Sequence, residues 1–533
     1  MHVVELSHLL LMSVDLQDTP FKASEFAIIN STNENDFRRE KTFTIKDSNN
    51  LELRLKIHYY NVPDSGGAFK ITVYSPYVIL NRTGMELDIR SKAVFGSSKS
   101  AAGQATFADT EGDARKPVPF MFSYPTDDRK NRALLKVGKS SWSQPVSFDA
   151  IGATVDVKLP AENGRSEMHA GLTVEEGSGK YKLTKVITVT PRFLVKNRLS
   201  EDIQIREPGS SDATSLKPGE LHPLRFLKQS TGQQLCVCFP GLNNSWSSPF
   251  DIANTGSVHV KLAKSGERQK LIRVEILTEG AMIFLHLSIE TKHWPFSIRN
   301  ESSQEYLFWQ ANPNIDEDEE DRSSGWKPVR YRLPPRSIMP YAWDYPASKN
   351  KNLILSASGK ERHVKLAEIG NLIPMKLPSG QGGQRPKIID LNVIADGPAQ
   401  TLVMSDFKQS KSIYKQKAAS ASASTATGFE VKEQDDDITL RATIRFAGVG
   451  VSLVNSQLRE LVYVTWRDIE LKYTDSQLYQ KVALIVKWIQ IDNQLYGGIF
   501  PLIAYPSVVP KTGKEMEAHP IFRTVVTRVK DDS

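Results

Sequence analysis

The sequence predicts an all-β protein: tandem β-sandwich repeats followed by an antiparallel β-meander. Three observations lead to this prediction. Strand patterns are abundant and helix patterns are scarce, a motif recurs at a domain-sized interval, and the pattern changes near residue 386. The strand patterns are short alternating runs of β-branched and aromatic residues, bounded by Gly, Pro and Asn. They occupy residues 51–60, 70–78, 183–189, 271–277 and 283–289.

Composition narrows the class of protein further. The chain has 533 residues, which predicts roughly three to five domains. Its net charge of +7 is small beside 68 basic and 61 acidic residues, so no nucleic-acid partner is indicated. Two cysteines cannot crosslink several domains, which indicates a cytosolic or at least a reducing compartment. No apolar run approaches the roughly 18 residues needed to span a bilayer.

Three copies of one motif run from a proline to an asparagine. In each copy the fourth residue before the asparagine is aromatic and the second is β-branched, and apolar residues follow six and eight places after it. Even spacing on both sides of a turn residue predicts a β-hairpin with one buried face. The marking residues Asn81, Asn197 and Asn300 are 116 and 103 residues apart, a spacing that suits β-sandwich domains. The apolar positions are Tyr77, Ile79, Leu87 and Ile89; Phe193, Val195, Ile203 and Ile205; and Phe296, Ile298, Tyr306 and Phe308.

Each copy follows a strand, a Gly-containing turn and another strand, which sets the expected domain boundaries. We expect a partial preceding repeat at 1–64 and β-sandwich repeats at 65–180, 181–285 and 286–385. The acidic run at 315–321 is interpreted as a solvated loop. Residues 409–436 form the expected flexible linker, with a low-complexity stretch at 415–428.

The segment 386–533 lacks the motif, and its strand patterns of similar length predict an antiparallel meander. Asp396-Gly397-Pro398 is a hairpin signal between two strand patterns. Five more patterns follow at 438–446, 449–455, 461–466, 469–473 and 482–491. In the last of them, the alternation of Val482, Leu484, Val486 and Trp488 places one apolar row on a single face. This row could face either acyl chains or an ordinary sandwich core.

The sequence offers little for catalysis. It contains no His-Glu-x-x-His, no His/Cys cluster at zinc spacing and no Gly-x-Ser-x-Gly elbow. Cys236 and Cys238 share one face of a strand and are interpreted as buried core thiols. We therefore predict no enzymatic activity, no metal and no cofactor. An unrecognised enzyme would need perturbed titratable groups gathered in one pocket. A glycan- or lipid-binding sandwich array without an adaptor role is the alternative function.

The repeated asparagine has two interpretations. It can shape the turn, by adopting positive φ or by bonding the backbone with its amide. It can also donate and accept hydrogen bonds with an extended peptide laid beside the strand. An asparagine that shapes the turn also presents the neighbouring edge, so both can hold at once.

Three long stretches resemble the vacuolar protein sorting thirteen (chorein) family of bridge-like lipid-transfer proteins. They are Asp64-Ser-Gly-Gly-Ala-Phe-Lys-Ile-Thr-Val-Tyr-Ser-Pro-Tyr-Val-Ile-Leu-Asn-Arg-Thr-Gly84, the box Pro340-Tyr-Ala-Trp-Asp-Tyr-Pro346 and Trp488-Ile-Gln-Ile-Asp-Asn-Gln-Leu-Tyr-Gly-Gly498. The box matches Pro119-Phe-Met-Phe-Ser-Tyr-Pro125 in type. The resemblance implies that 1–385 is the latter part of the adaptor-binding β-repeat domain. Residues from about 386 would then begin a segment of the lipid-transfer rod.

The resemblance also implies partners and a location. Organelle adaptors carrying Pro-x-Pro segments would dock on the last repeat, with Asn300 shaping an edge that Phe296, Ile298, Tyr306 and Phe308 support. Glycerophospholipid acyl chains would contact the C-terminal segment. The protein would be cytoplasmic and peripheral at membrane contact sites of endosome or vacuole and mitochondria. The second repeat departs from the pattern: Arg192 is inserted after its proline, and Pro223-Leu-Arg-Phe226 is a degraded box.

Overall fold

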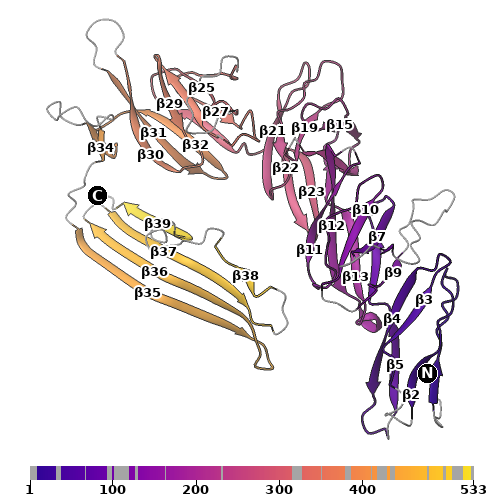
Figure 1. The fold of residues 1–533 in the computed structure, drawn as a ribbon. Coiled ribbons are helices and arrows are strands. Elements are labelled where there is room, and N and C mark those ends of the chain that lie inside the picture. The colour runs from indigo at the N-terminus through magenta and orange to yellow at the C-terminus, as the bar shows by residue number, and fades with distance from the viewer. Residues whose placement is uncertain are drawn as a thin grey trace. The chain divides into compact units, whose positions relative to one another are not determined.

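The regular secondary structure of the described residues is almost wholly strand, which confirms the all-β prediction (Figure 1). The computed structural model describes residues 9–529 except 32–37, 66–67, 93–98, 101–118, 127–129, 163, 230–231, 315–326, 350, 379–385, 410, 417–428, 432–437, 477–478, 496–499 and 507–519. The acidic run at 315–321 and most of the expected linker therefore lie outside the described residues. The described helix is a single 3₁₀ turn, η1 (Gly179–Tyr181).

The chain divides into two compact units, residues 1–429 and 430–533. In the described part of either unit, no helix has the length and apolar character that a membrane crossing requires. The first unit begins with a partial sandwich whose small core includes Ile29, Phe43 and Leu55. Its strands are β1 (Leu9–Met12), β2 (Ala27–Ser31), β3 (Thr42–Lys46), β4 (Glu52–Asn61) and β5 (Phe69–Tyr74).

The first sandwich spans residues 77–191 and encloses one hydrophobic core between two sheets. One sheet has the order β11 (Thr154–Pro160), β12 (Ser166–Glu176), β13 (Lys185–Pro191), β6 (Tyr77–Asn81), β9 (Phe120–Phe122). The other has the order β10 (Arg132–Val137), β7 (Leu87–Lys92), β8 (Lys99–Ser100).

The second sandwich spans residues 193–289 and repeats this plan. Its first sheet is β17 (Leu221–Pro223), β14 (Phe193–Asn197), β23 (Met282–Ile289), β22 (Lys270–Glu279), β21 (Gly256–Leu262). Its second sheet is β16 (Thr214–Leu216), β15 (Ile203–Arg206), β19 (Gln234–Cys238), β20 (Phe250–Asp251). A further strand, β18 (Phe226–Lys228), pairs with β12 of the first sandwich and so joins the two.

The third sandwich spans residues 296–406. Its first sheet is β27 (Ser337–Tyr341), β24 (Phe296–Asn300), β32 (Ala399–Asp406), β31 (Lys387–Asp396), β30 (Gly370–Leu377). Its second sheet is β26 (Tyr331–Leu333), β25 (Tyr306–Gln310), β28 (Leu353–Ala357), β29 (Lys360–Val364). β31 and β32 form the hairpin predicted around Gly397, whose φ is 61°.

The strands on either side of each marking asparagine do not form the predicted hairpin. β6 and β7 belong to opposite sheets, as do β14 and β15, and β24 and β25. The asparagine therefore marks a corner at which the chain crosses from one sheet to the other. Even spacing directs apolar side chains toward the core whether the two strands form a hairpin or lie in opposite sheets. The spacing shows which side of a strand a residue lies on, and it does not show which strand is the neighbour.

The sheets also divide the chain at other residues than expected. The first strand of each sandwich pairs in parallel with its last strand: β6 with β13, β14 with β23, and β24 with β32. The strand pair that precedes each motif therefore closes the previous sandwich. Sandwiches thus begin at residues 77, 193 and 296, instead of 65, 181 and 286. Residues 387–406, which were expected in the meander, complete the third sandwich.

The pairing register offsets the two aromatic boxes by two residues. Tyr77 lies opposite Phe122, whereas its equivalent Phe296 lies opposite Tyr341. Phe122 and Tyr341 are therefore equivalent in space, although the match in residue type aligns Phe120 with Tyr341.

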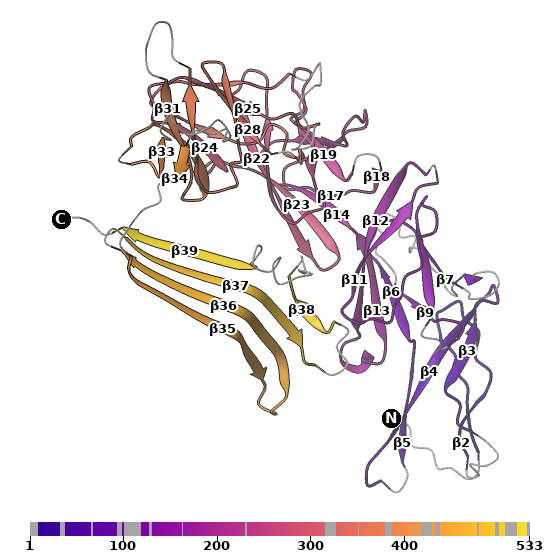
Figure 2. The same cartoon turned by 60° about the vertical axis from the view of Figure 1, so that its left-hand side comes forward.

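The second unit is one antiparallel sheet with three long strands, which lie side by side in Figures 1 and 2. Patterns expected as separate strands are continuous here: 438–446 with 449–455, and 461–466 with 469–473. The strands are β35 (Ile438–Val454), β36 (Glu460–Ser476), β37 (Tyr479–Asn493), β38 (Leu502–Ala504) and β39 (Phe522–Val529). In the part of the sequence that follows the third sandwich and precedes β35, β33 (Tyr414–Gln416) pairs with β34 (Phe429–Val431).

Candidate functional site

The three marking asparagines hold their corners through the same two hydrogen bonds. Each side chain is buried, and its Oδ1 accepts from the N–H two residues ahead, at 3.0 Å for Asn81, 2.9 Å for Asn197 and 3.0 Å for Asn300. Each Nδ2 donates to the carbonyl four residues ahead, at 2.7, 2.9 and 2.7 Å. None of the three is among the described residues with positive φ. Of the two ways to shape a turn, backbone bonding by the amide is the one observed.

Asn300 uses both amide hydrogens within its own sandwich. Besides the Gln304 carbonyl, Nδ2 donates to the Pro334 carbonyl at 2.8 Å, in the loop that leads into β27. The hydroxyl of Ser302 donates to Oδ1 at 2.8 Å. Asn197 makes the matching second bond to the Leu216 carbonyl at 3.0 Å. An amide nitrogen has only two hydrogens, and both hydrogens of Asn300 bond to backbone carbonyls of the third sandwich. Asn300 therefore holds the corner and, through Pro334, the path of the chain into β27.

The apolar residues expected to support an edge meet in the core of the third sandwich. Ile298, Tyr306 and Phe308 are completely buried. Phe308 stacks on Tyr331 with ring centres 5.2 Å apart. Phe296 is partly exposed and meets Trp343 edge-on at 5.3 Å. Three of the four residues are thus core, and Phe296 is the one that reaches the surface.

The edge beside the Asn300 corner is β27, which pairs only with β24 among the described strands. The amide of Glu301 donates to Met404 at 2.8 Å, and that of Gln400 to Pro295 at 3.1 Å, so alternate residues of β24 bond to β32. The intervening residues bond to β27. Ile338 and Pro340 therefore direct their backbone groups outward, away from β24. The Ile338 side chain is 58% exposed.

Sequence reasoning missed Ile338. The available signal was Pro340, because proline within a strand indicates an edge whose N–H side faces away from the ladder. The opposite edge, β30, lies against the segment that follows: the Tyr414 hydroxyl donates to the Asn371 carbonyl at 3.2 Å, and the Lys376 ammonium lies 5.0 Å from the Phe429 ring centre.

The second sandwich carries a matching edge with different surroundings. Asn197 bonds through its N–H to the Glu220 carbonyl at 3.0 Å, so Leu221 and Pro223 of β17 face outward. Leu221 is 45% exposed. After β17 the chain turns to β18, which is added to the first sandwich. Arg192, the inserted residue, donates to the Ala281 carbonyl at 2.7 Å.

From Leu440 to Phe446, and on the strands paired with this stretch, the long sheet of the second unit has one apolar and one polar face. On the polar face Glu470 binds Arg445 at 2.8 Å and Lys472 at 3.0 Å, and these hydrogen bonds lower the pKa of its carboxyl. Phe446, on the apolar face, is 50% exposed. By register the apolar face holds Leu440, Ala442, Ile444 and Phe446; Ile469, Leu471 and Tyr473; Val482, Leu484 and Val486; and Phe522 and Val526.

The apolar pattern changes phase at one level of this sheet. Ala447, Asp468 and Lys487 lie at that level, and Asp468 has a φ of 51°. Trp488, the expected end of the apolar row, lies just beyond it, opposite Arg467, and donates to Gln490 at 3.2 Å. Val482, Leu484 and Val486 share the apolar face as predicted, whereas Trp488 has polar neighbours.

The described residues contain no group of three or more His, Cys, Asp or Glu side chains placed to hold a metal. Cys236 and Cys238 are buried and unbridged, and burial raises the pKa of both thiols. Two candidate binding surfaces stand apart, each within its own unit: the β27 edge of the third sandwich and the apolar face of the long sheet.

Known proteins are similar to this chain in sequence. A family model described as the adaptor binding domain of vacuolar-sorting associated protein 13 matches residues 1–350. The chain is 55% identical to the intermembrane lipid transfer protein VPS13 of Chaetomium thermophilum, over 100% of this chain and 16% of that protein. It is 24% identical to vps13E of Dictyostelium discoideum over 90% of the chain and 12% of the relative. It is 26% identical to human VPS13D over 65% of the chain and 8% of the relative. The chain spans a small part of each relative.

Proposed function

Because the chain belongs to the vacuolar-sorting associated protein 13 family, we propose that its third sandwich binds proline-containing segments of organelle adaptors. The matched family model names an adaptor binding domain, so adaptor proteins are the partners of this domain. The finer proposal is that a Pro-x-Pro segment adds to β27 as an antiparallel strand and so brings the lipid-transfer protein to a membrane contact site.

The outward backbone of Ile338 is the observation that carries this proposal. Ile338 offers one N–H and one C=O to an incoming strand, whereas Pro340 offers only a C=O. In a Pro-x-Pro segment the two prolines are two residues apart, so both nitrogens face the same side. When that side faces away from the sheet, the middle residue directs its N–H and C=O toward the edge. It can then exchange both hydrogen bonds with Ile338.

The surroundings of the edge favour a proline ligand. The partly exposed Phe296 and the exposed Ile338 supply apolar surface beside it. Proline is already extended before binding, so it loses little conformational entropy. Backbone bonds then provide affinity, and contacts to the prolines provide selectivity.

The test removes the outward donor at Ile338 and leaves the side of the strand that faces β24 intact. In the full chain, Ile338→Pro should weaken binding of a Pro-x-Pro peptide by about 1–3 kcal/mol, measured by calorimetry. Leu221→Pro is the matched control, because it makes the same change at the equivalent edge of the second sandwich. Equal losses from both variants would contradict the assignment, as would full binding by a chain that lacks the third sandwich.

The exposed apolar face of the second unit favours a second proposed role, contact with lipid acyl chains. The relatives are named intermembrane lipid transfer proteins. A sheet that is apolar on one side and ion-paired on the other can shield acyl chains while its polar side faces water. Side chains of Leu440, Ile444 and Phe446 are available for this contact, since each is about half exposed.

Two neighbouring substitutions separate this role from a general effect on the sheet. Ile444→Asp places a charge on the apolar face, and Thr443→Asp places the same charge on the polar face of the same strand. In the full chain, we expect Ile444→Asp to reduce crosslinking to a lipid with a photoreactive acyl chain. Thr443→Asp should leave it unchanged. Equal crosslinking by both variants would exclude this face from lipid contact.

A further inference from the structure

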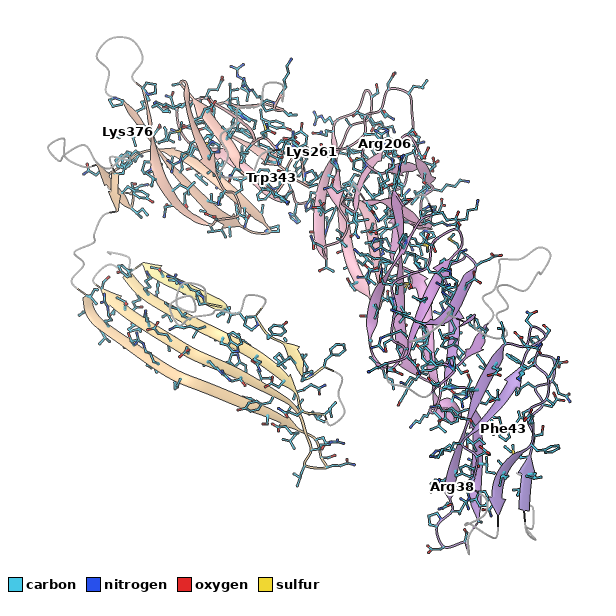
Figure 3. All side chains as sticks on the ribbon, in the orientation of Figure 1. Arg38, Phe43, Arg206, Lys261, Trp343 and Lys376 are labelled. Atoms are coloured by element: carbon cyan, nitrogen blue, oxygen red, sulfur yellow. The ribbon has the colours of Figure 1, made fainter. Side chains whose placement is uncertain are left out.

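A lysine of the second sandwich is buried against the third. The ammonium of Lys261, on β21, lies 2.7 Å from Oδ1 of Asp344 and donates to the Tyr331 hydroxyl at 2.9 Å. The side chains of Lys261 and Asp344 are 7% and 9% exposed. The ammonium is also 4.8 Å from the ring centre of Tyr331 and 4.7 Å from that of Tyr341. Figure 3 labels Lys261 and, from the neighbouring box of the third sandwich, Trp343.

This ion pair crosses between two separate hydrophobic cores. Lys261 belongs to the second sandwich, and Tyr331, Tyr341 and Asp344 belong to the third. The Tyr331 hydroxyl also donates to Oδ1 of Asp344 at 2.6 Å. One carboxylate oxygen is therefore the meeting point of a cation from one sandwich and a hydroxyl from the next.

Stability alone is a poor explanation for a buried charge pair. Removing both charges from water costs free energy that the attraction repays only in good geometry, and an apolar pair of similar size often does as well. Burial accordingly lowers the pKa of Lys261, while Asp344 opposes that shift. A buried pair instead favours one orientation of the two parts that it joins, because its charges are paired in that orientation and unpaired in others.

The surroundings of Asp344 contain few other groups that could compensate its charge. Oδ2 of Asp344 and the hydroxyl of Tyr341 are buried and have no hydrogen-bond partner among the described residues. If Lys261 were displaced, the carboxylate would keep only the Tyr331 hydroxyl as a described partner. A packing that displaced Lys261 and kept Asp344 buried would leave a poorly compensated charge.

We propose that Lys261 is a positioning residue that fixes the orientation of the third sandwich against the second. Tyr341, which forms one wall of the lysine site, is the last residue of β27. The lysine site and the proposed peptide edge therefore share a strand. To this extent the inference also rests on the proposed function: the orientation fixed by Lys261 sets the direction in which that edge faces.

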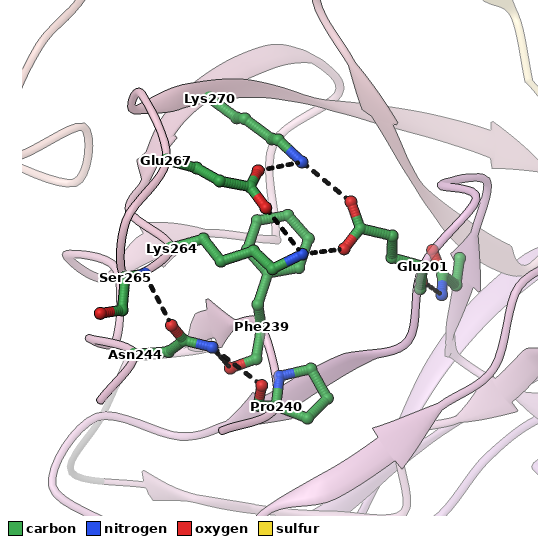
Figure 4. A network of polar contacts seen from close by, with 9 residues as sticks. Glu201, Phe239, Pro240, Asn244, Lys264, Ser265, Glu267 and Lys270 are labelled. Carbon is green, nitrogen blue, oxygen red and sulfur yellow. Dashed lines mark hydrogen bonds and ion pairs between the residues drawn. The ribbon is translucent and has the colours of Figure 1, made fainter. Parts of the chain in front are cut away.

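The second sandwich contains a matched control with the same chemistry at its surface. Lys264 and Lys270 each bind Glu201 and Glu267 at 2.7–3.0 Å, and both ammonium groups lie near the ring of Phe239 (Figure 4). These side chains are 25–42% exposed, and every one of them belongs to the second sandwich. Exposed pairs of this kind contribute little to stability and define no orientation between sandwiches.

The experiment measures the distance between the two sandwiches in the full chain. Spin labels are attached at Lys217→Cys and Lys360→Cys, both exposed positions, while the native Cys236 and Cys238 are buried. Lys261→Met should broaden and shift the distance distribution measured by pulsed electron resonance. Lys264→Met should leave it unchanged, and Lys261→Arg, which keeps the charge, should restore most of the order.

A second variant guards against simple unfolding. Lys261→Met combined with Asp344→Asn leaves no unpaired buried charge, so this protein should keep its thermal transition and still show the broad distribution. A narrow, unshifted distribution in the folded double variant would overturn the proposal. Pro-x-Pro peptide affinity is measured on the same samples. Order lost with affinity unchanged would leave the positioning role standing and would separate it from the peptide edge.

Discussion

The second and third sandwiches share a backbone plan but differ in what fills it. Both turn a corner on a buried asparagine, both place a proline-bearing strand at the adjoining edge, and both close with a parallel pairing of first and last strands. The second core is mainly aliphatic, and three of its buried residues are Phe193, Phe239 and Phe250. The third contains a cluster of contacting rings, formed by Phe296, Phe308, Tyr331, Tyr341 and Trp343.

This difference separates architecture from recognition. The corner asparagine and the edge proline shape the backbone, so they have the same effect in a sandwich with an aliphatic core and in one with an aromatic core. Tyrosines add hydroxyl groups to the third core, and burial raises the pKa of Tyr306 to about 12 and also those of Tyr331 and Tyr341. The neutral hydroxyl of Tyr331 donates to Asp344, and the rings of Tyr331 and Tyr341 frame the site of Lys261. An aliphatic core such as that of the second sandwich has no group to do this.

The largest expected effect is on the ring cluster. Phe308→Ala removes a completely buried ring that contacts both Tyr331 and Tyr341, and should destabilise the third sandwich by about 3–5 kcal/mol. Hydrogen exchange in urea should show loss of protection in residues 296–406 with the second sandwich retained. Ile205→Ala, at the equivalent position, should produce the reverse pattern. Simultaneous loss in both sandwiches would mean that they form one cooperative unit.

A smaller effect is expected at the corners, where the two sandwiches should respond alike in stability and differently in binding. Asn197→Ala and Asn300→Ala each leave buried backbone groups unpaired, at about 1–3 kcal/mol for each group. Local exchange rates should rise to a similar extent in both variants.

Peptide binding should distinguish the two corners. Asn300→Ala frees the loop at Pro334 that leads into β27, so Pro-x-Pro affinity should fall by about 1–3 kcal/mol. Asn197→Ala should cost much less. Equal losses of affinity would contradict the assignment of the peptide to the third sandwich.

The smallest expected effect concerns pH. Burial lowers the pKa of His222, His259 and His286, all in the second sandwich, below the ordinary value. A histidine whose pKa is lower folded than unfolded favours folding while neutral. This stability is present above about pH 6.5, the unfolded value, and is lost progressively as the pH falls from there through the lower folded pKa. Pulse proteolysis at pH 7.5 and 5.5 should show the second sandwich weakening more than the third. A larger loss in the third would refute this expectation.

The positions of most sandwich strands and of one hairpin could be predicted from the sequence. Alternation located β6, β14 and β24, and Gly397 marked the hairpin of β31 and β32, because both signals are local properties of the backbone. The repeated asparagines were found in the same way, and the two hydrogen bonds that all three share reach no more than four residues ahead. The choice between positive φ and amide bonding needed the structure, because both produce a turn from the same residue type.

The neighbours of each strand were decided by tertiary structure. The motif strands were expected as hairpins and lie in opposite sheets, and the strand pair before each motif closes the previous sandwich. The two boxes match in residue type but are offset by two residues in register. Each of these depends on pairing between segments far apart in the chain, which a period of two does not encode.

Burial of charge was likewise invisible in the sequence. Lys261 lies on a strand whose pattern gives it no special place, and Asp344 is one polar residue in an aromatic box. Only the approach of two sandwiches brings them to 2.7 Å and removes both from water. The sequence alone determined which faces turn inward, because alternation and turn chemistry act over a few residues. Tertiary structure decided which faces, edges and charges meet, because those contacts form between segments separated by about a hundred residues and depend on the packing of whole sandwiches.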